Sequence, residues 1–80
     1  MNYEEIQMFE YDMNNLYNKV RYEANLFIVV STNERSFTTS YKNFMNIPDE
    51  NSIQVYDMGY FVISYSDIVE LTYEVEKHPQ

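Results

Sequence analysis

The side chains that could do chemistry in this chain are mostly carboxylates. Thirteen Asp and Glu residues stand against five Lys and Arg residues. The stretch from residue 43 to 76 contains no Lys or Arg, and its carboxylates are Asp49, Glu50, Asp57, Asp67, Glu70, Glu74 and Glu76. This stretch also carries the clearest strand pattern in the chain. The arrangement of negative charge on a sheet is therefore the first feature to interpret.

The row Glu70, Glu74 and Glu76 is the most informative part of this stretch. Alternate side chains of a strand recur on one face at about 6.6–6.8 Å, so the three carboxylates are predicted to lie in a line on the solvent face. That spacing is on the scale of the phosphates along one nucleic-acid strand, about 3.4 Å of axis per charge. Asp57 and Asp67, at the ends of neighbouring strands, are expected to extend the row. Such a surface would imitate a phosphate backbone.

An ordinary solvated strand face is the alternative interpretation of the same row. Charged side chains on an edge strand also prevent pairing with other chains. The absence of any base between residues 43 and 76 argues against this alternative, because solvated faces normally mix both signs.

Tyrosines accompany the acidic residues. Tyr56, Tyr60 and Tyr65 flank the turns of this half, and tyrosine is among the residues most enriched at interface hot spots. We expect an acidic rim that steers a basic partner and tyrosine rings that anchor it. Tyr41 and Tyr73 are predicted to lie inside, with Tyr56 and Tyr60 more exposed.

Residues for catalysis or metal binding are not evident. The only histidine, His78, is close to the chain end, there is no cysteine, and no nucleophile-elbow or phosphate-loop motif occurs. The cluster at residues 49–51 lacks the ligand spacing of a calcium loop. Asp67 and Glu70 as an acid–base pair lack polar substrate-binding neighbours. We therefore expect no enzyme, no catalytic residue, no metal and no cofactor.

The net charge of −8 restricts the possible partners. It disfavours direct binding to nucleic acid or to anionic membranes and favours basic protein surfaces. The longest apolar run, residues 26–30, is too short to span a bilayer, and no signal peptide is recognised. The expected protein is soluble and cytoplasmic, with residues 1–80 as one domain.

The first element is predicted to be a helix over residues 3–22. Its apolar residues fall at steps of three and four, and Asn2 can cap it. The apolar stripe is expected to pack on the rest of the domain, or alternatively to contact a partner chain; its members are Ile6, Phe9, Met13, Leu16 and Val20.

Residues 24–76 are predicted to form five short antiparallel strands. The expected strands cover residues 24–31, 36–42, 52–57, 60–65 and 69–75, with a loop at 43–51 and a loose tail at 77–80. The first strand is apolar on both faces, which predicts cover on both sides. Ile53 and Val55 are expected inside, and Gly59 is expected to supply a positive φ in a turn. The last strand is predicted to bury Val69, Leu71, Tyr73 and Val75.

The expected fold class is α+β, a helix followed by a five-stranded antiparallel meander. The order of elements over residues 24–76, with a short connector at residues 66–68 before the last strand, resembles the small barrels of the Sm-like and SH3-like type. That resemblance implies a barrel or a strongly bent sheet. An open sheet with the helix across one face is the alternative.

In size, acidity and tyrosine content the chain is similar in type to small phage and mobile-element inhibitors, including anti-CRISPR proteins and DNA-mimic inhibitors. This similarity implies an inhibitor that binds a basic protein built to hold DNA or RNA, in the cytoplasm of a host cell if the protein is phage-encoded. The alternative is a structural module that self-associates, and a homodimer is compatible with either function.

Overall fold

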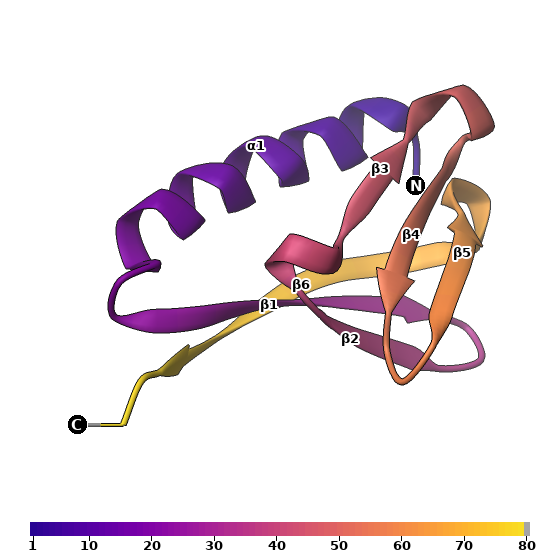
Figure 1. The fold of residues 1–80 in the computed structure, drawn as a ribbon. Coiled ribbons are helices and arrows are strands. Elements are labelled where there is room, and N and C mark those ends of the chain that lie inside the picture. Colours follow the sequence, from indigo (N-terminus) through magenta and orange to yellow (C-terminus); the bar gives the residue numbers. More distant parts are fainter. Residues whose placement is uncertain (80) are drawn as a thin grey trace.

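The computed structural model describes residues 1–79 and contains one helix followed by six strands (Figure 1). The helix and strands are α1 (Tyr3–Val20), β1 (Ala24–Thr32), β2 (Ser36–Ser40), β3 (Met45–Ile47), β4 (Ser52–Tyr56), β5 (Tyr60–Ser64) and β6 (Ile68–Lys77). Three single-turn 3-10 helices connect them: η1 (Tyr41–Asn43), η2 (Pro48–Glu50) and η3 (Tyr65–Asp67).

Helix α1 begins with a capping box. The Asn2 side chain accepts a hydrogen bond from the Glu5 backbone N–H at 2.9 Å, and the Glu5 carboxylate accepts one from the Asn2 N–H at 3.1 Å. The helix ends at Val20, two residues before the predicted end, because residues 21–23 turn the chain back into β1. The Arg21 N–H still donates to the Tyr17 carbonyl at 2.9 Å and closes the last turn.

The strands form two antiparallel sheets of three strands each, ordered β2-β1-β6 and β3-β4-β5. The α+β class is confirmed, but the prediction of five strands is wrong and no ladder closes residues 1–79 into a barrel. The expected loop at 43–51 contains β3, which pairs with β4. Because η1 separates β2 from β3, no continuous bent strand runs from one sheet into the other.

The core lies between α1 and the two sheets. Strand β1 buries Leu26, Ile28 and Val30 toward the helix, whereas Phe27 and Val29 on its other face are only partly covered. The predicted cover on both faces of this strand is therefore wrong. The helix stripe contributes Ile6 and Met13 as buried residues, and the rest of the core consists of Phe37, Ile53, Val55, Ile63, Tyr65 and Ile68.

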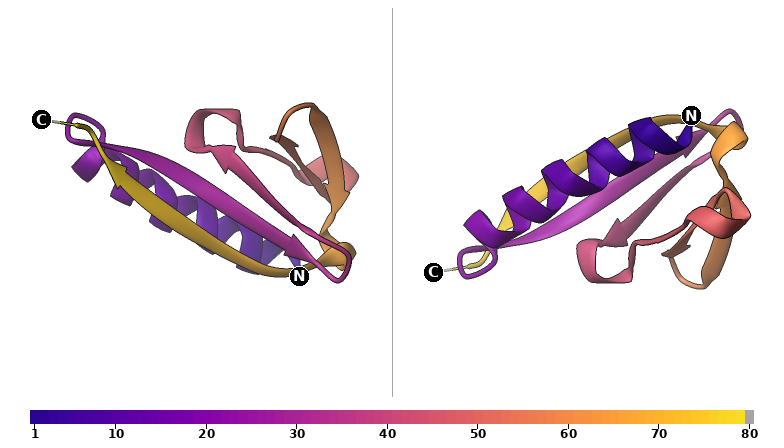
Figure 2. Two further views of the ribbon diagram at one scale, coloured as in Figure 1. Left: turned by 90° about the horizontal axis from the view of Figure 1, so that it is seen from below. Right: turned by 90° about the horizontal axis from the view of Figure 1, so that it is seen from above.

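Strand β6 lies at one edge of the larger sheet and is only partly covered. Its register with β1 places Leu71, Tyr73 and Val75 opposite core residues of β1, so the predicted facing is right. The predicted burial is not, because Leu71 is half-buried while Tyr73 and Val75 are 51% and 42% exposed. Val69 is 54% exposed. Figure 2 shows the reason, since α1 runs over the larger sheet and no further element lies beyond β6.

The predicted loose tail at 77–80 is also incorrect in its first part. Strand β6 extends through Lys77, which pairs with Ala24. The His78 N–H donates to the Glu23 carbonyl at 2.9 Å. Gln80 lies outside the described residues.

The turn between β4 and β5 requires two unusual backbone conformations. Gly59 has a φ of 156°, which confirms the predicted positive φ. Met58 has a φ of 56°, in the left-handed region that a side chain disfavours, and it is 97% exposed. Its side chain therefore offers no packing in return for the strained backbone.

Replacing Met58 by Asn is expected to stabilise the protein by about 0.5–1 kcal/mol, because Asn tolerates the left-handed conformation and no buried contact is lost. Urea unfolding measures the change. Gly59→Ala is the opposite control and should destabilise, since its φ of 156° strains any side chain although the nearest atom to an added Cβ is 3.9 Å away. A lower free energy of unfolding for Met58→Asn than for wild type would show that the backbone at Met58 is not strained.

Core and edge positions are predicted to respond differently to truncation. Ile53→Ala removes a fully buried side chain and should lower the free energy of unfolding by about 2–5 kcal/mol. Val69→Ala on β6 should cost less than about 1 kcal/mol, because that side chain is largely exposed. Equal losses in urea unfolding would mean that β6 is covered in solution.

Candidate partner-binding surfaces

The three glutamates of β6 lie on one exposed face. Glu70, Glu74 and Glu76 pair with Ser31, Phe27 and Asn25 of β1, on the side of the sheet that faces away from α1. All three are exposed, as predicted. Among residues 1–79 the single ion pair joins other side chains, so no Lys or Arg neutralises the row. This acidic row, defined as Glu70, Glu74 and Glu76, is a line of exposed carboxylates that form no ion pair within the described part of the chain.

Asp57 is not part of the acidic row. Its carboxylate lies 3.7 Å from the Arg35 guanidinium and accepts a hydrogen bond from the Thr38 N–H at 3.1 Å. Thr38 belongs to β2, at the opposite edge of the sheet from β6. Residues 43–76 contain no Lys or Arg, but folding brings Arg35 from the β1–β2 hairpin to Asp57 and so places a base beside this stretch.

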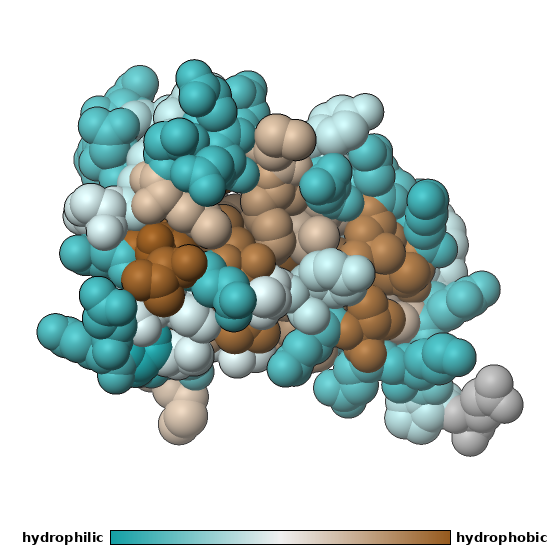
Figure 3. All heavy atoms as spheres, turned by 180° about the vertical axis from the view of Figure 1, so that it is seen from behind, coloured by the Kyte–Doolittle hydropathy of each residue, from teal (hydrophilic) through white to brown (hydrophobic). Residues whose placement is uncertain are grey.

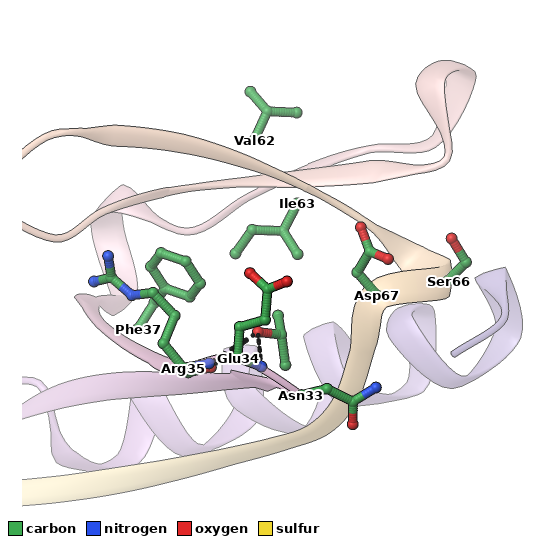
Figure 4. A pocket seen from close by; sticks show the side chains of 9 residues that line it. Asn33, Glu34, Arg35, Phe37, Val62, Ile63, Ser66 and Asp67 are labelled. Atoms are coloured by element: carbon green, nitrogen blue, oxygen red, sulfur yellow. Dashed lines mark hydrogen bonds between the residues drawn. The ribbon is translucent and has the colours of Figure 1, made fainter.

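Asp67 lies in η3, directly before β6, and lines a cavity of about 320 Å³ at the tip of the β1–β2 hairpin. Figure 4 shows the carboxylates of Glu34 and Asp67 directed into this space, with Ile63 pointing toward it from β5. The Arg35 guanidinium lies 4.1 Å from the Phe37 ring centroid. The cavity therefore carries more negative than positive charge, because Arg35 is already engaged by Asp57.

Residues 1–79 contain no cluster of three or more His, Cys, Asp or Glu side chains placed to hold a metal ion. Asp49 and Glu50 are exposed in η2. The next residue, Asn51, has a φ of 49° and caps the end of this 3-10 helix. Glu50 and Asn51 line a shallow hollow with Met1 and Asn2 near the start of α1. These two acids therefore lie apart from the acidic row.

Tyr56 and Tyr60 are exposed, as predicted, and they form an aromatic pair. They face each other across the β4–β5 ladder with ring centroids 5.0 Å apart in an edge-on arrangement. Exposed apolar side chains surround them on the smaller sheet and its turn, and together they define the tyrosine patch: Met45, Tyr56, Met58, Tyr60 and Val62.

The tyrosine patch and the acidic row lie on different parts of the molecule. The Tyr56 N–H donates to the Thr39 hydroxyl at 3.1 Å, which places β4 beside β2. Strand β6 is at the other edge of the larger sheet, with β1 between them. The expected surface, with tyrosine anchors inside an acidic rim, is thus separated into two surfaces.

Tyr65 is a core residue, so its predicted role as an exposed anchor is wrong. It begins η3 with its side chain turned inward, 4% exposed. Its hydroxyl donates to the Asn46 side-chain oxygen, and the Asn46 amide donates to the Glu10 carboxylate at 2.7 Å. This chain of hydrogen bonds joins η3, β3 and α1. Tyr73, predicted to be inside, is the exposed residue instead.

The basic side chains gather where α1 ends, which the sequence reading did not anticipate. Lys19 is in the last turn of α1 and Lys77 pairs with Ala24 at the start of β1. A cavity of about 390 Å³ at the same end is lined by residues that include Arg21, Lys42 and His78. Of the five bases, only Arg35 lies at the other end of the larger sheet, so four bases lie near the end of the sheet at which Glu76 pairs with Asn25.

Comparison with protein-family models, curated proteins and solved structures finds no match to this chain. Within residues 1–79, α1 is not long and apolar enough to cross a membrane.

Tyr65→Phe is expected to lower the free energy of unfolding by about 1 kcal/mol near neutral pH, because it leaves the Asn46 oxygen without its donor. Burial, with a further contribution from Glu10, raises the pKa of the Tyr65 hydroxyl above its usual value. The native state then holds this proton more tightly than the unfolded state. The free energy of unfolding of wild type should fall as the pH rises above the unfolded-state pKa of about 10. The difference in this free energy between wild type and Tyr65→Phe should therefore become smaller.

Urea unfolding near neutral pH and again above pH of about 10 measures this difference. Tyr60→Phe is the matched control, since its hydroxyl is exposed and its removal should change stability by less than about 0.5 kcal/mol. A Tyr65→Phe protein as stable as wild type near neutral pH would show that the hydrogen bond to Asn46 contributes nothing.

Proposed function

We propose that this chain is an acidic inhibitor that binds a basic, nucleic-acid-handling surface of another protein and catalyses no reaction itself. The observation that carries this proposal is the acidic row, whose three carboxylates are exposed on one face with no ion-pair partner among residues 1–79. A host-cell cytoplasm, for a phage-encoded protein of the anti-CRISPR or DNA-mimic type, is the proposed setting.

The mechanism is competition for Lys and Arg. A basic groove that holds DNA or RNA contacts phosphates at regular intervals, and carboxylates on alternate positions of a strand recur at about 6.6–6.8 Å. The row would replace some of these phosphate contacts. Because the attraction is electrostatic and solvent-exposed, affinity is expected to fall as salt increases.

The tyrosine patch supports a second contact with the same or another partner. Its five members are exposed, and Tyr is frequent among hot-spot residues. Because this patch lies on the β2 side of the larger sheet, a partner that touched both surfaces would have to wrap around the sheet. The acidic row alone therefore carries the proposal.

A self-associating structural module is the second candidate. The observation in its favour is exposed apolar surface, on β6 and in the tyrosine patch. Sedimentation separates the two functions: a closed ring of identical subunits that is insensitive to salt supports the module, and a monomer or dimer that displaces DNA from a basic protein supports the inhibitor.

The proposal predicts that charge reversal at two of the three carboxylates of the acidic row abolishes partner binding without unfolding the protein. Immobilised wild type, the double variant Glu70→Lys/Glu74→Lys, and the control Glu4→Lys/Glu34→Lys would be exposed to bacterial lysate at low salt. Both variants change net charge equally, at exposed positions. Wild type and control should retain nucleic-acid-binding proteins that duplex DNA elutes, and the row variant should not.

Mass spectrometry identifies the retained proteins, and circular dichroism verifies that each variant is folded. Retention by the folded row variant equal to that of wild type would remove the acidic row from the function. Equal loss in both variants would show that only net charge matters.

A further inference from the structure

Strand β6 has a free edge over most of its length; at its first residue the Ile68 carbonyl accepts a hydrogen bond from the Met1 ammonium group at 3.3 Å. The strand is ten residues long and lies last in the order β2-β1-β6, with β1 as its one neighbour among the described strands. Along any strand the backbone N–H and C=O groups point alternately to the two sides, so half of those in β6 face away from β1. An extended chain that lies beside β6 can pair with them.

A hydrophobic groove runs beside this edge. Its volume is about 490 Å³, and it lies between α1 and the core-facing side of β6. Its lining is mostly apolar, with Asp12 as the one charged member: Phe9, Asp12, Met13, Leu16, Leu71, Thr72 and Tyr73. Seen from behind, hydrophobic atoms are exposed in a band across the middle of the molecule, with hydrophilic atoms above and below them (Figure 3). A strand added to β6 would place alternate side chains against this groove.

The two faces of β6 select different side chains. The face toward α1 presents Leu71, Tyr73 and Val75, and the opposite face presents the acidic row. A strand beside β6 therefore needs apolar residues at one set of alternate positions and positive residues at the other. Favourable cross-strand pairs stabilise a sheet, and like charges directly opposite each other destabilise it.

We propose that β6 is a docking edge for an extended segment of the partner in which Lys or Arg alternates with apolar residues, and that this segment adds as a fourth strand to the larger sheet. The inference rests on the proposed function for the nature of the partner, and it specifies how that partner is held. Main-chain hydrogen bonds provide affinity, and the alternation of charge and apolar groups provides specificity.

The same charges disfavour a second copy of this chain as the occupant. Two β6 strands paired antiparallel about Thr72 would place Glu70 of each copy opposite Glu74 of the other. Paired about Tyr73, they would place Glu70 opposite Glu76. In the remaining registers the acidic face of one copy lies on the same side of the sheet as the apolar face of the other. Glutamates of one copy then lie opposite Leu71 and Val75 of the other. Each arrangement joins like charges or sets charge beside apolar groups, so the row selects against self-pairing.

A labelled peptide of about nine residues with alternating Lys and Val is long enough to span most of β6 at about 3.3 Å per residue. Binding to the full chain would be measured by fluorescence anisotropy and by amide hydrogen exchange of β6. The composition control has the same residues with all Lys grouped at one end. The backbone controls are two peptides that are N-methylated at one or the other alternating set of positions.

We expect the alternating peptide to bind about tenfold or more tightly than the grouped peptide and to slow exchange in β6. One N-methylated peptide should lose binding by about tenfold or more, because it cannot donate to β6, while the other keeps it. The Glu70→Lys/Glu74→Lys variant should prefer an alternating Glu and Val peptide, which wild type rejects. Its stability in urea verifies that it is folded.

Equal binding of alternating, grouped and both N-methylated peptides would overturn strand addition and leave the acidic inhibitor intact, since charge alone would then account for binding. Strand addition without displacement of DNA from any captured protein would instead end the proposed inhibitor while keeping the docking edge. Protection of β6 that rises with protein concentration and without peptide would assign the edge to a second copy and overturn the proposal.

Discussion

A single helix cannot cover a sheet of three strands, and this limit shapes the whole molecule. A helix with its side chains is about 10–12 Å wide, whereas three strands spaced about 4.7–4.9 Å apart span about 14–15 Å when half a spacing is counted at each edge. Helix α1 buries the core-facing side of β1, and the smaller sheet covers the core at β2. There the ring centroids of Phe37 and Phe61 lie 5.0 Å apart. Nothing among the described residues performs the same task at β6. The exposure of Tyr73 and Val75 follows from this asymmetry.

Local periodicity accounts for the parts of the structure that could be predicted from the sequence. The stripe of α1, the alternation in β2 and the burial of Ile53 and Val55 depend on neighbours along the chain and on one covering layer. The facing of β6 was predictable for the same reason, because alternation assigns its side chains to two sides. Its burial was not, since alternation does not say whether anything lies over the apolar side.

The other errors come from contacts between distant parts of the chain. The residues that flank Tyr65 do not mark it as buried, and only the meeting of η3, β3 and α1 makes Tyr65 a buried donor to Asn46. The base-free stretch suggested one acidic surface, but the β1–β2 hairpin brings Arg35 to Asp57 across 22 positions of sequence, from 35 to 57. No local pattern carries these pairings. The Arg35–Asp57 pair also links the β1–β2 hairpin to the β4–β5 turn, where no ladder joins the two sheets.

An exposed edge strand with an apolar face is ordinarily a site of aggregation, and charged side chains are a common protection. On the outer face of β6 the protecting charges all have one sign. Glu70, Glu74 and Glu76 share this face, and β1, β2 and β6 place no Lys or Arg on it, since Lys77 pairs with the buried Ala24 and lies on the other face. Mixed charges would oppose every incoming strand about equally. Charges of one sign oppose strands that carry acids, including a second copy, and favour strands that carry bases. In this strand, the three carboxylates that disfavour self-pairing are therefore the same ones that the proposed function uses to recognise a basic partner.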